Sequence, residues 1–144
     1  MNSIKIKEAL LKHANTFFGE APVLFAYLYG SYAVDQSHPF SDLDIAIYTK
    51  KPLATRENMK LEMNLSLKID NKFPVGPSSE VRTLNHLPLA VAGSVITEGV
   101  LIYCIDDDTR IDFEMNIRRS YFDFLPYMKN YQRMYLAQID DKRT

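Results

Sequence analysis

Apolar and polar residues alternate along the chain with periods that predict helices and strands in turn. Residues 3–18 place apolar side chains at spacings of three and four, which is typical of an amphipathic helix. The run 23–29 is continuously apolar and rich in aromatic residues, so its length and composition favour a buried strand. Residues 42–49 alternate strictly, with apolar side chains from Leu43 to Ile47 on one face, and predict a second strand.

The second half of the chain predicts further alternation of helices and strands. The expected elements are a helix over 55–73, a strand over 79–84, a helix over 88–98, a strand over 100–105 and a C-terminal helix broken near Pro126 that resumes to Gln138. The order is α-β-β-α-β-α-β-α, without an internal repeat or a linker. We therefore expect one α/β (α+β) domain over 1–144, with a core at about 20–125 and a C-terminal helical segment at about 109–138.

The C-terminal segment is rich in aromatic residues. They are Tyr121, Phe122, Phe124, Tyr127, Tyr131 and Tyr135. We expect most of them to pack onto the core, while any exposed ones would suit contact with a partner, because aromatic residues are enriched at interface hot spots.

Composition and charge exclude several classes of protein. Apolar residues make up 47% of the 144 residues and charged residues 24%, with a formal net charge of −1. Such a balance offers no strongly basic face for a phosphate backbone, so direct nucleic-acid binding is not expected. No apolar run approaches the roughly 18 residues of a membrane span, and the N-terminus does not resemble a signal peptide. We expect a cytoplasmic protein without a membrane partner.

A Gly-Ser pair follows the first predicted strand. Gly30 removes a side chain where the strand ends, which allows backbone conformations closed to other residues and the close approach of a phosphate. Ser31 is a good N-cap for a short helix, and its hydroxyl and nearby amides are suited to triphosphate oxygens. The pair alone is weak support, because Gly-Ser at a strand end is usually only a turn.

Two aspartates open the second strand. Asp42 and Asp44 are two residues apart, so both carboxylates project from one face, opposite the apolar residues. Two such carboxylates repel each other unless a cation offsets their charge, and Mg²⁺ prefers oxygen ligands of this kind. A pair of metal ions about 3.5–4 Å apart activates an attacking oxygen and stabilises a leaving one. The alternative is a solvated strand end with a capping aspartate.

A third carboxylate would have to come from a neighbouring strand. Glu80 in the strand predicted over 79–84 is the candidate. Glu80 and Arg82 share a face of that strand, so a surface ion pair between them is the alternative interpretation.

Gly30-Ser31, ten further residues and Asp42-x-Asp44 together resemble the signature of the DNA polymerase beta-like nucleotidyltransferases, in particular the minimal nucleotidyltransferase (MNT) antitoxins of HEPN/MNT toxin–antitoxin pairs. The segments 84–88 and 96–103 are similar to the family as well, so that the resemblance covers roughly residues 20–125. It implies the polymerase beta-like fold, a small mixed sheet flanked by helices.

The resemblance also implies roles for individual residues. Gly30 and Ser31 would hold the triphosphate of ATP, while Asp42, Asp44 and Glu80 would be catalytic and ligate two Mg²⁺ ions. Two positions depart from the family: Glu80 stands where Asp is common, and Asp35 stands where Gly is frequent.

The implied function is neutralisation of a HEPN ribonuclease toxin by transfer of AMP from ATP to a toxin tyrosine, within a hetero-oligomer of the two proteins. Two alternatives remain open from the sequence. One is a non-catalytic antitoxin that neutralises its toxin by binding; the intact Asp42-x-Asp44 argues against it, since a pure binder need not retain two adjacent acids, and the Glu80 departure keeps it open. The other is a nucleotidyltransferase acting on a small molecule, which usually needs more chain to build an acceptor pocket.

Overall fold

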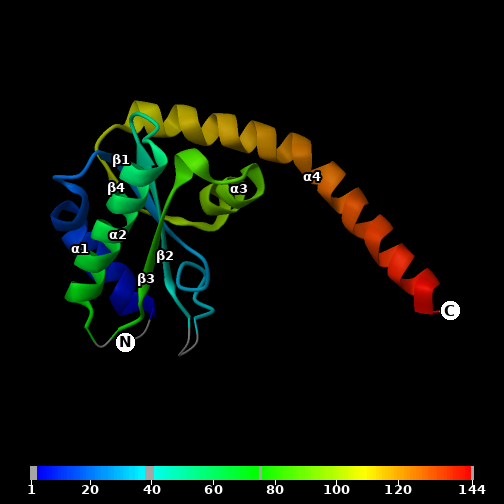
Figure 1. Ribbon diagram of the computed structural model, residues 1–144, viewed down its shortest axis with the longest axis horizontal. Helices are drawn as coiled ribbons and strands as arrows, with labels where there is room; N and C mark the ends of the chain where they lie inside the picture. Colours follow the sequence, from blue (N-terminus) through cyan, green and yellow to red (C-terminus); the bar gives the residue numbers. More distant parts are fainter. Residues whose placement is uncertain (1–2, 38–40, 75, 144) are drawn as a thin grey trace.

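The chain folds into one four-stranded mixed sheet with helices on both faces (Figure 1). The computed structural model describes residues 3–37, 41–74 and 76–143. Its elements are α1 (Ser3–Phe18), β1 (Val23–Tyr29), β2 (Leu43–Thr49), α2 (Thr55–Lys72), β3 (Ser79–Thr83), the 3₁₀ turn η1 (Leu84–His86), α3 (Leu89–Glu98), β4 (Val100–Cys104) and α4 (Asp107–Arg143). The predicted order of helices and strands and the predicted fold class are confirmed.

The strands are arranged in the order β3-β2-β1-β4. β1 pairs antiparallel with both β2 and β4, whereas β2 and β3 run parallel. Because β2 and β3 are parallel, their first residues lie at the same end of the sheet, where the antiparallel β1 ends. The start of β2, the start of β3 and the end of β1 therefore meet.

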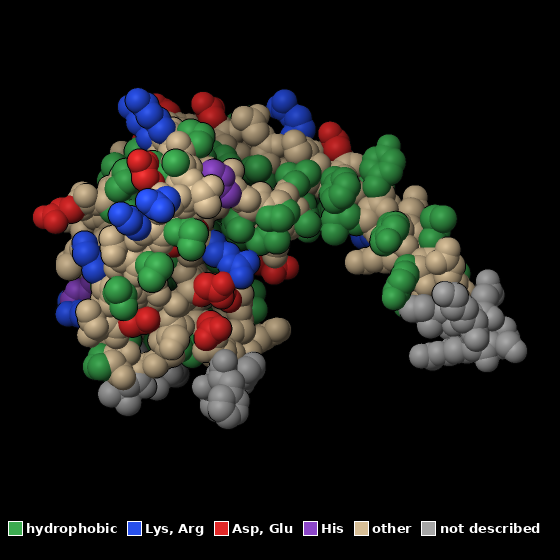
Figure 2. Space-filling model, viewed as in Figure 1, with side chains coloured by type: hydrophobic (Ala, Val, Ile, Leu, Met, Phe, Trp, Pro, Cys, Tyr) green, Lys and Arg blue, Asp and Glu red, His purple; other side chains and the backbone are tan. Residues whose placement is uncertain are grey.

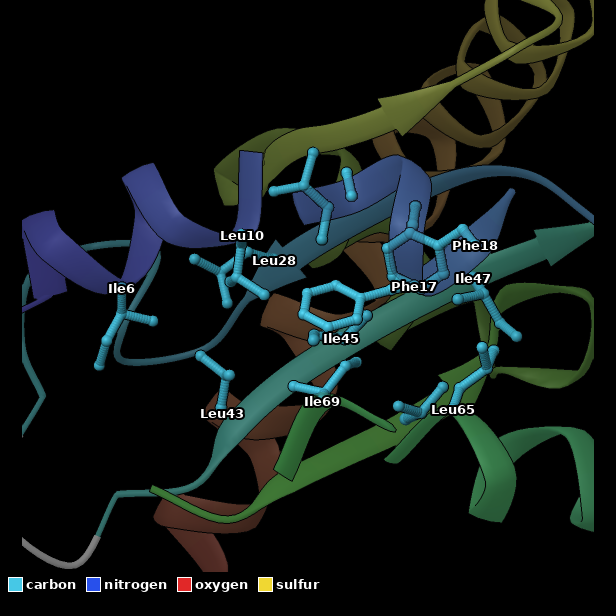
Figure 3. Close-up of a cluster of buried hydrophobic side chains, with 14 of the residues drawn as sticks. Ile6, Leu10, Phe17, Phe18, Leu28, Leu43, Ile45, Ile47, Leu65 and Ile69 are labelled. Carbon is cyan, nitrogen blue, oxygen red and sulfur yellow. The ribbon is translucent and has the colours of Figure 1, made fainter. Parts of the chain in front are cut away.

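One face of the sheet packs against α1 and α2. The alternate residues Leu43, Ile45 and Ile47 of β2 are fully buried there, as their spacing predicts. The cluster draws on every element of this layer (Figure 3). Its members besides those of β2 include Ile6, Leu10, Phe17, Phe18, Leu28, Leu65 and Ile69. Spacings of three and four turn one side of each helix toward the sheet.

The opposite face packs against α3 and the first part of α4. Ala46 is fully buried and Tyr48 half-buried here, so the face that carries Asp44 is covered along most of β2. Tyr48 stacks on Phe25 with ring centroids 4.6 Å apart, and Phe113 of α4 packs against both rings. Asp44, at the start of β2 on this face, is half-buried.

The C-terminal helix differs from the prediction in two ways. α4 runs without a break from Asp107 to Arg143, with Pro126 inside it, instead of breaking near Pro126 and ending at Gln138. Pro126 cannot donate a hydrogen bond to the carbonyl of Phe122, four residues before it, and its ring crowds that carbonyl. Phe122 lies on an exposed stretch, where water can bond the freed carbonyl. The helix accommodates the proline, and its axis bends about midway along its length (Figure 1).

The expected packing of the C-terminal aromatic residues onto the core is also wrong for most of them. Tyr121 is half-buried, but the exposed side chains of Phe122, Phe124, Tyr127, Tyr131 and Tyr135 lie beyond it. α4 extends past α3, so these side chains have no surface of the body beneath them (Figure 1). Within the described chain, no helix combines the length and apolar character needed to cross a membrane.

Gly93 of α3 lets α4 approach closely, and its replacement tests that contact. A Cβ at Gly93 would collide with the ring of Tyr121. We expect Gly93→Ala to lower the free energy of unfolding by about 1–3 kcal/mol, the usual cost of overpacking. Ser94→Ala, at the exposed neighbouring position of the same helix, is the control and should stay close to wild type. Equal stability of the two variants in chemical denaturation would show that α4 is not held by this contact.

Candidate functional site

Three strands bring a tyrosine and two carboxylates into one row across the sheet. Asp44 of β2 is the register partner of Tyr29 on β1 and of Glu80 on β3. Directly paired residues have Cβ atoms about 4.5–5.5 Å apart. The sequence suggested that Glu80 would come from a strand next to Asp44, and the register places it there. Asp42 lies two residues before Asp44, at the exposed entry to β2.

Gly30 opens the space in front of Asp44. Its φ of 74° lies in the left-handed region, and a Cβ at this position would collide with the Oδ2 atom of Asp44. For both reasons, any residue other than glycine would be strained at this position. The glycine is therefore required by more than an ordinary turn. It leaves the Asp44 carboxylate accessible from the end of β1.

The residues after Gly30 form a compact turn instead of the short helix that Ser31 was expected to cap. The N–H of Ala33 donates to the carbonyl of Gly30 at 3.1 Å, and the N–H of Gln36 donates to the carbonyl of Ser31 at 2.8 Å. These bonds close tight turns over residues 31–35, so no helix begins at Ser31. The half-buried Ser31 remains beside Gly30, at the end of β1.

Asp35 and Lys7 hold this turn in place. Asp35 has a φ of 57°, the left-handed conformation that glycine adopts most easily and that Asp tolerates better than most residues. The Lys7 ammonium of α1 donates to the Asp35 carboxylate and to the carbonyl of Ala33, both at 3.0 Å. Asp35 thus adopts a backbone conformation that glycine would also adopt at this position. Its side chain adds an ion pair with Lys7 of α1.

Hydrogen bonds from α2 fix the edge strand that carries Glu80. The N–H of Ser79 donates to the Asp70 carboxylate at 2.7 Å, and the N–H of Thr83 donates to Glu62 at 2.8 Å. These bonds lie on either side of Glu80 along β3. The position of Glu80 is therefore set by the backbone and does not depend on its own side chain.

The side chain of Glu80 is paired with Arg82. Nε and Nη2 of Arg82 donate to Oε1 of Glu80 at 2.9 and 2.6 Å, and both side chains are about half exposed. This is the surface ion pair that the sequence left open as an alternative. Among the residues that the structure describes, no three His, Cys, Asp or Glu side chains form a ready-made metal site.

The charges around Asp44 are unfavourable to its ionised form. Burial raises the pKa of Asp44, and the charges of Glu80 and Asp42 raise it further, while Arg82 acts in the opposite direction. Burial and the charge of Asp44 also raise the pKa of Tyr29 to about 12, which keeps its hydroxyl protonated. A divalent cation would relieve the repulsion among the carboxylates. Their oxygen atoms are the ligands that Mg²⁺ prefers, so the donor set fits this ion.

The raised pKa of Asp44 makes a testable prediction about stability. Its ionised form costs folding free energy; that cost is absent below the ordinary pKa of 3.8 and grows as the pH rises through the raised value. We expect Asp44→Asn to raise the melting temperature at pH 7, with the gain disappearing at the acid end. Asp123→Asn, exposed on α4, is the control. A gain that persists below pH 3.8 would show that ionisation of Asp44 is not its cause.

The comparisons with known proteins agree with this fold. Residues 5–108 match the family model described as polymerase beta, nucleotidyltransferase. Among solved structures, a mutant of the toxin–antitoxin complex MntA–HpeT gives a TM-score of 0.56 at 19% identity, over 100% of both chains.

Two more solved structures have the same fold. A rebuilt structure of a tri-AMPylated Shewanella oneidensis HEPN toxin in complex with its MNT antitoxin gives a TM-score of 0.57 at 16% identity, over 96% of this chain and 99% of that one. A toxin–antitoxin structure with AMP-PNP gives 0.53 at 21% identity, over 100% of both chains. The family model covers well over half of the chain and includes all three strands of the carboxylate row. The chain belongs to the polymerase beta-type nucleotidyltransferases.

Proposed function

We propose that this protein is an antitoxin that transfers AMP from ATP to a tyrosine hydroxyl of a cognate HEPN ribonuclease toxin. The observation that carries the proposal is the row formed by Asp44 and Glu80, with Gly30 leaving the Asp44 carboxylate accessible. The solved structures with the same fold support the acceptor and the nucleotide. One holds a tri-AMPylated HEPN toxin beside its MNT antitoxin, and another holds AMP-PNP.

In this proposal the turn after β1 receives the triphosphate. Gly30 lets the phosphates approach the backbone, and the half-buried Ser31 contributes its hydroxyl. The hydrogen bonds from Lys7 to Ala33 and Asp35 hold the turn in one conformation before the nucleotide binds. A site ordered in advance loses less conformational entropy on binding.

Asp42, Asp44 and Glu80 would hold Mg²⁺ beside the nucleotide. The metal, when bound, offsets charge on the triphosphate and lowers the pKa of the attacking hydroxyl. Glu80 would leave Arg82 to join the other two carboxylates, which its long side chain and half-exposed position permit. Tyr29 stays protonated beside Asp44, so it adds no further negative charge to the row.

In the transfer itself, a hydroxyl oxygen attacks the α-phosphorus in line, a new P–O bond forms, and the bond to pyrophosphate breaks. Positioning and electrostatics supply most of the rate in such transfers. An AMP group on a toxin tyrosine would place bulk and negative charge where RNA phosphate must bind.

Transfer of label from α-³²P-ATP in the presence of Mg²⁺ tests this function. The acceptor is the HEPN-type product of the neighbouring gene, and the enzyme variants are wild type and Asp42→Ala/Asp44→Ala. We expect label on the toxin with wild type and a loss of at least about 1,000-fold in the variant, since positioning and charge are removed together. Asp108→Ala/Asp112→Ala, an exposed acidic pair on α4, is the control and should keep full activity.

One observation favours a second candidate function, neutralisation by binding alone. Arg82 occupies the carboxylate of Glu80, so the third acidic position is engaged in an ion pair in this structure. If wild type binds and silences the toxin without transferring label, and the Asp42/Asp44 variant does the same, neutralisation by contact is the function.

Two single variants, Glu80→Gln and Arg82→Gln, distinguish between the two roles considered for Glu80. As a metal ligand, Glu80 is needed for transfer, and its replacement should lower kcat by about 100-fold or more, whereas Arg82→Gln should keep most of the activity. If Glu80 serves only as the partner of Arg82 in a surface ion pair, the transfer rate of both variants should stay close to that of wild type. Initial rates at saturating ATP and toxin distinguish these outcomes.

A further inference from the structure

The face of α4 that packs onto the body continues beyond it as an exposed apolar stripe. Phe113 and Ile117 of α4 lie against the cluster on the sheet, and Tyr121 packs against Gly93. At spacings of three and four residues the same face continues through Phe124, Met128, Tyr131 and Tyr135. We call these last four residues the α4 stripe.

The α4 stripe is accessible over its whole length. Phe124 is 42% exposed, Tyr131 72% and Tyr135 57%, while Met128 between them is half-buried. Phe124, Met128 and Tyr131 also line a shallow cavity together with Tyr127. Contiguous exposed apolar side chains on a protein surface often belong to interaction sites. The helix beyond Tyr121 has no layer of the body beneath it (Figure 1).

The position of the stripe relative to the carboxylate row indicates what it binds. α4 projects from the body and bends toward the side of the sheet where β2 begins (Figure 1). Figure 2 shows acidic side chains gathered on the lower part of the body, to one side of the projecting helix. A protein seated on the stripe would lie next to the end of the sheet that carries Asp42 and Asp44. A small acceptor could use the carboxylate row without touching α4.

The other faces of the same segment carry its charges. Arg118, Arg119, Lys129 and Arg133 are exposed there, against the single acidic residue Asp123 among the described side chains of 118–138. The segment thus carries an aromatic stripe on one face and a net positive charge on its other faces. Its chemical complement is an apolar groove whose rim carries carboxylates.

We propose that the α4 stripe is the docking surface for the acceptor protein, which binds it in an apolar groove with an acidic rim. The inference rests on the proposed function for the identity of the acceptor, the HEPN toxin. The four side chains of the stripe are spaced at i, i+4, i+7 and i+11, which is the spacing of the residues that an amphipathic helix inserts into a groove. Its two tyrosines provide large contact areas with few rotatable bonds and polar ends that tolerate water.

The test compares two sets of exposed apolar residues on the same segment. The stripe variant is Phe124→Ser/Tyr131→Ser/Tyr135→Ser. The control is Phe122→Ser/Leu136→Ser, which replaces side chains that are 60% and 61% exposed on other faces of the helix. Neither set supports the core, so both variants should fold. Circular dichroism and the shift in melting temperature with Mg²⁺ and ATP verify the fold and the nucleotide site in each.

Calorimetric titration with the toxin, together with label transfer over a range of toxin concentrations, gives the readout. We expect the stripe variant to bind at least about tenfold more weakly, because each truncated anchor at a hot spot costs a factor of this order, while the control stays within about twofold of wild type. Transfer by the stripe variant should fall at low toxin concentration and recover at saturation. Its KM for toxin then rises while kcat is kept.

Three outcomes separate the docking inference from the catalytic proposal. If wild type binds toxin through the stripe but transfers no label, the docking surface stands and the catalytic function fails. If wild type labels the toxin and the stripe variant does so with the same KM, the docking inference is overturned. A third result also overturns it: wild type alone is a dimer, the stripe variant is a monomer, and both bind the toxin equally well. In that case a second copy of the chain occupies the stripe.

Discussion

The parallel pairing of β2 with β3, beside an antiparallel β1, is the constraint on which the site depends. It brings the start of two strands and the end of a third to one end of the sheet, and the register puts Asp44 between Tyr29 and Glu80. Burial and the neighbouring like charges both disfavour the ionised form of Asp44, and together they raise its pKa. The fully buried apolar face of β2 holds the strand against this repulsion. A fold can keep such a row only where the surrounding core overrides it.

Much of the fold could be predicted from the sequence because its periodicities are clear. The alternation of Leu43, Ile45 and Ile47 identified the buried face of β2, and all three side chains are fully buried. The spacing of Asp42 and Asp44 on the other face led to the carboxylate pair. The sequence also suggested Glu80 and its competing pairing with Arg82, and the structure shows both the register and the ion pair. The ligand roles of the three carboxylates remain proposals.

The errors have a common origin in effects that a local pattern does not contain. Ser31 has the character of an N-cap, but bonds within the turn close the backbone before a helix can begin. Pro126 suggested a helix end, yet the helix continues with a bend (Figure 1), because on an exposed segment water can bond the carbonyl that the proline frees. The aromatic residues beyond Tyr121 looked like core because composition does not reveal where the body stops. The left-handed φ of Asp35 likewise follows from the turn and from Lys7, neither of which its own residue type specifies.

One continuous helix joins the part of α4 on the sheet to the part beyond the body, and this has a consequence for protection of the backbone. Amide hydrogens around Phe113 and Ile117 can exchange only when the apolar cluster on the sheet opens. Those beyond Tyr121 are released by fraying from the C-terminal end, at the much smaller cost of unwinding a solvated helix. Local stability therefore falls along α4 while its secondary structure stays the same. Any molecule that covers the outer part would extend the slow exchange of the core toward the C-terminus.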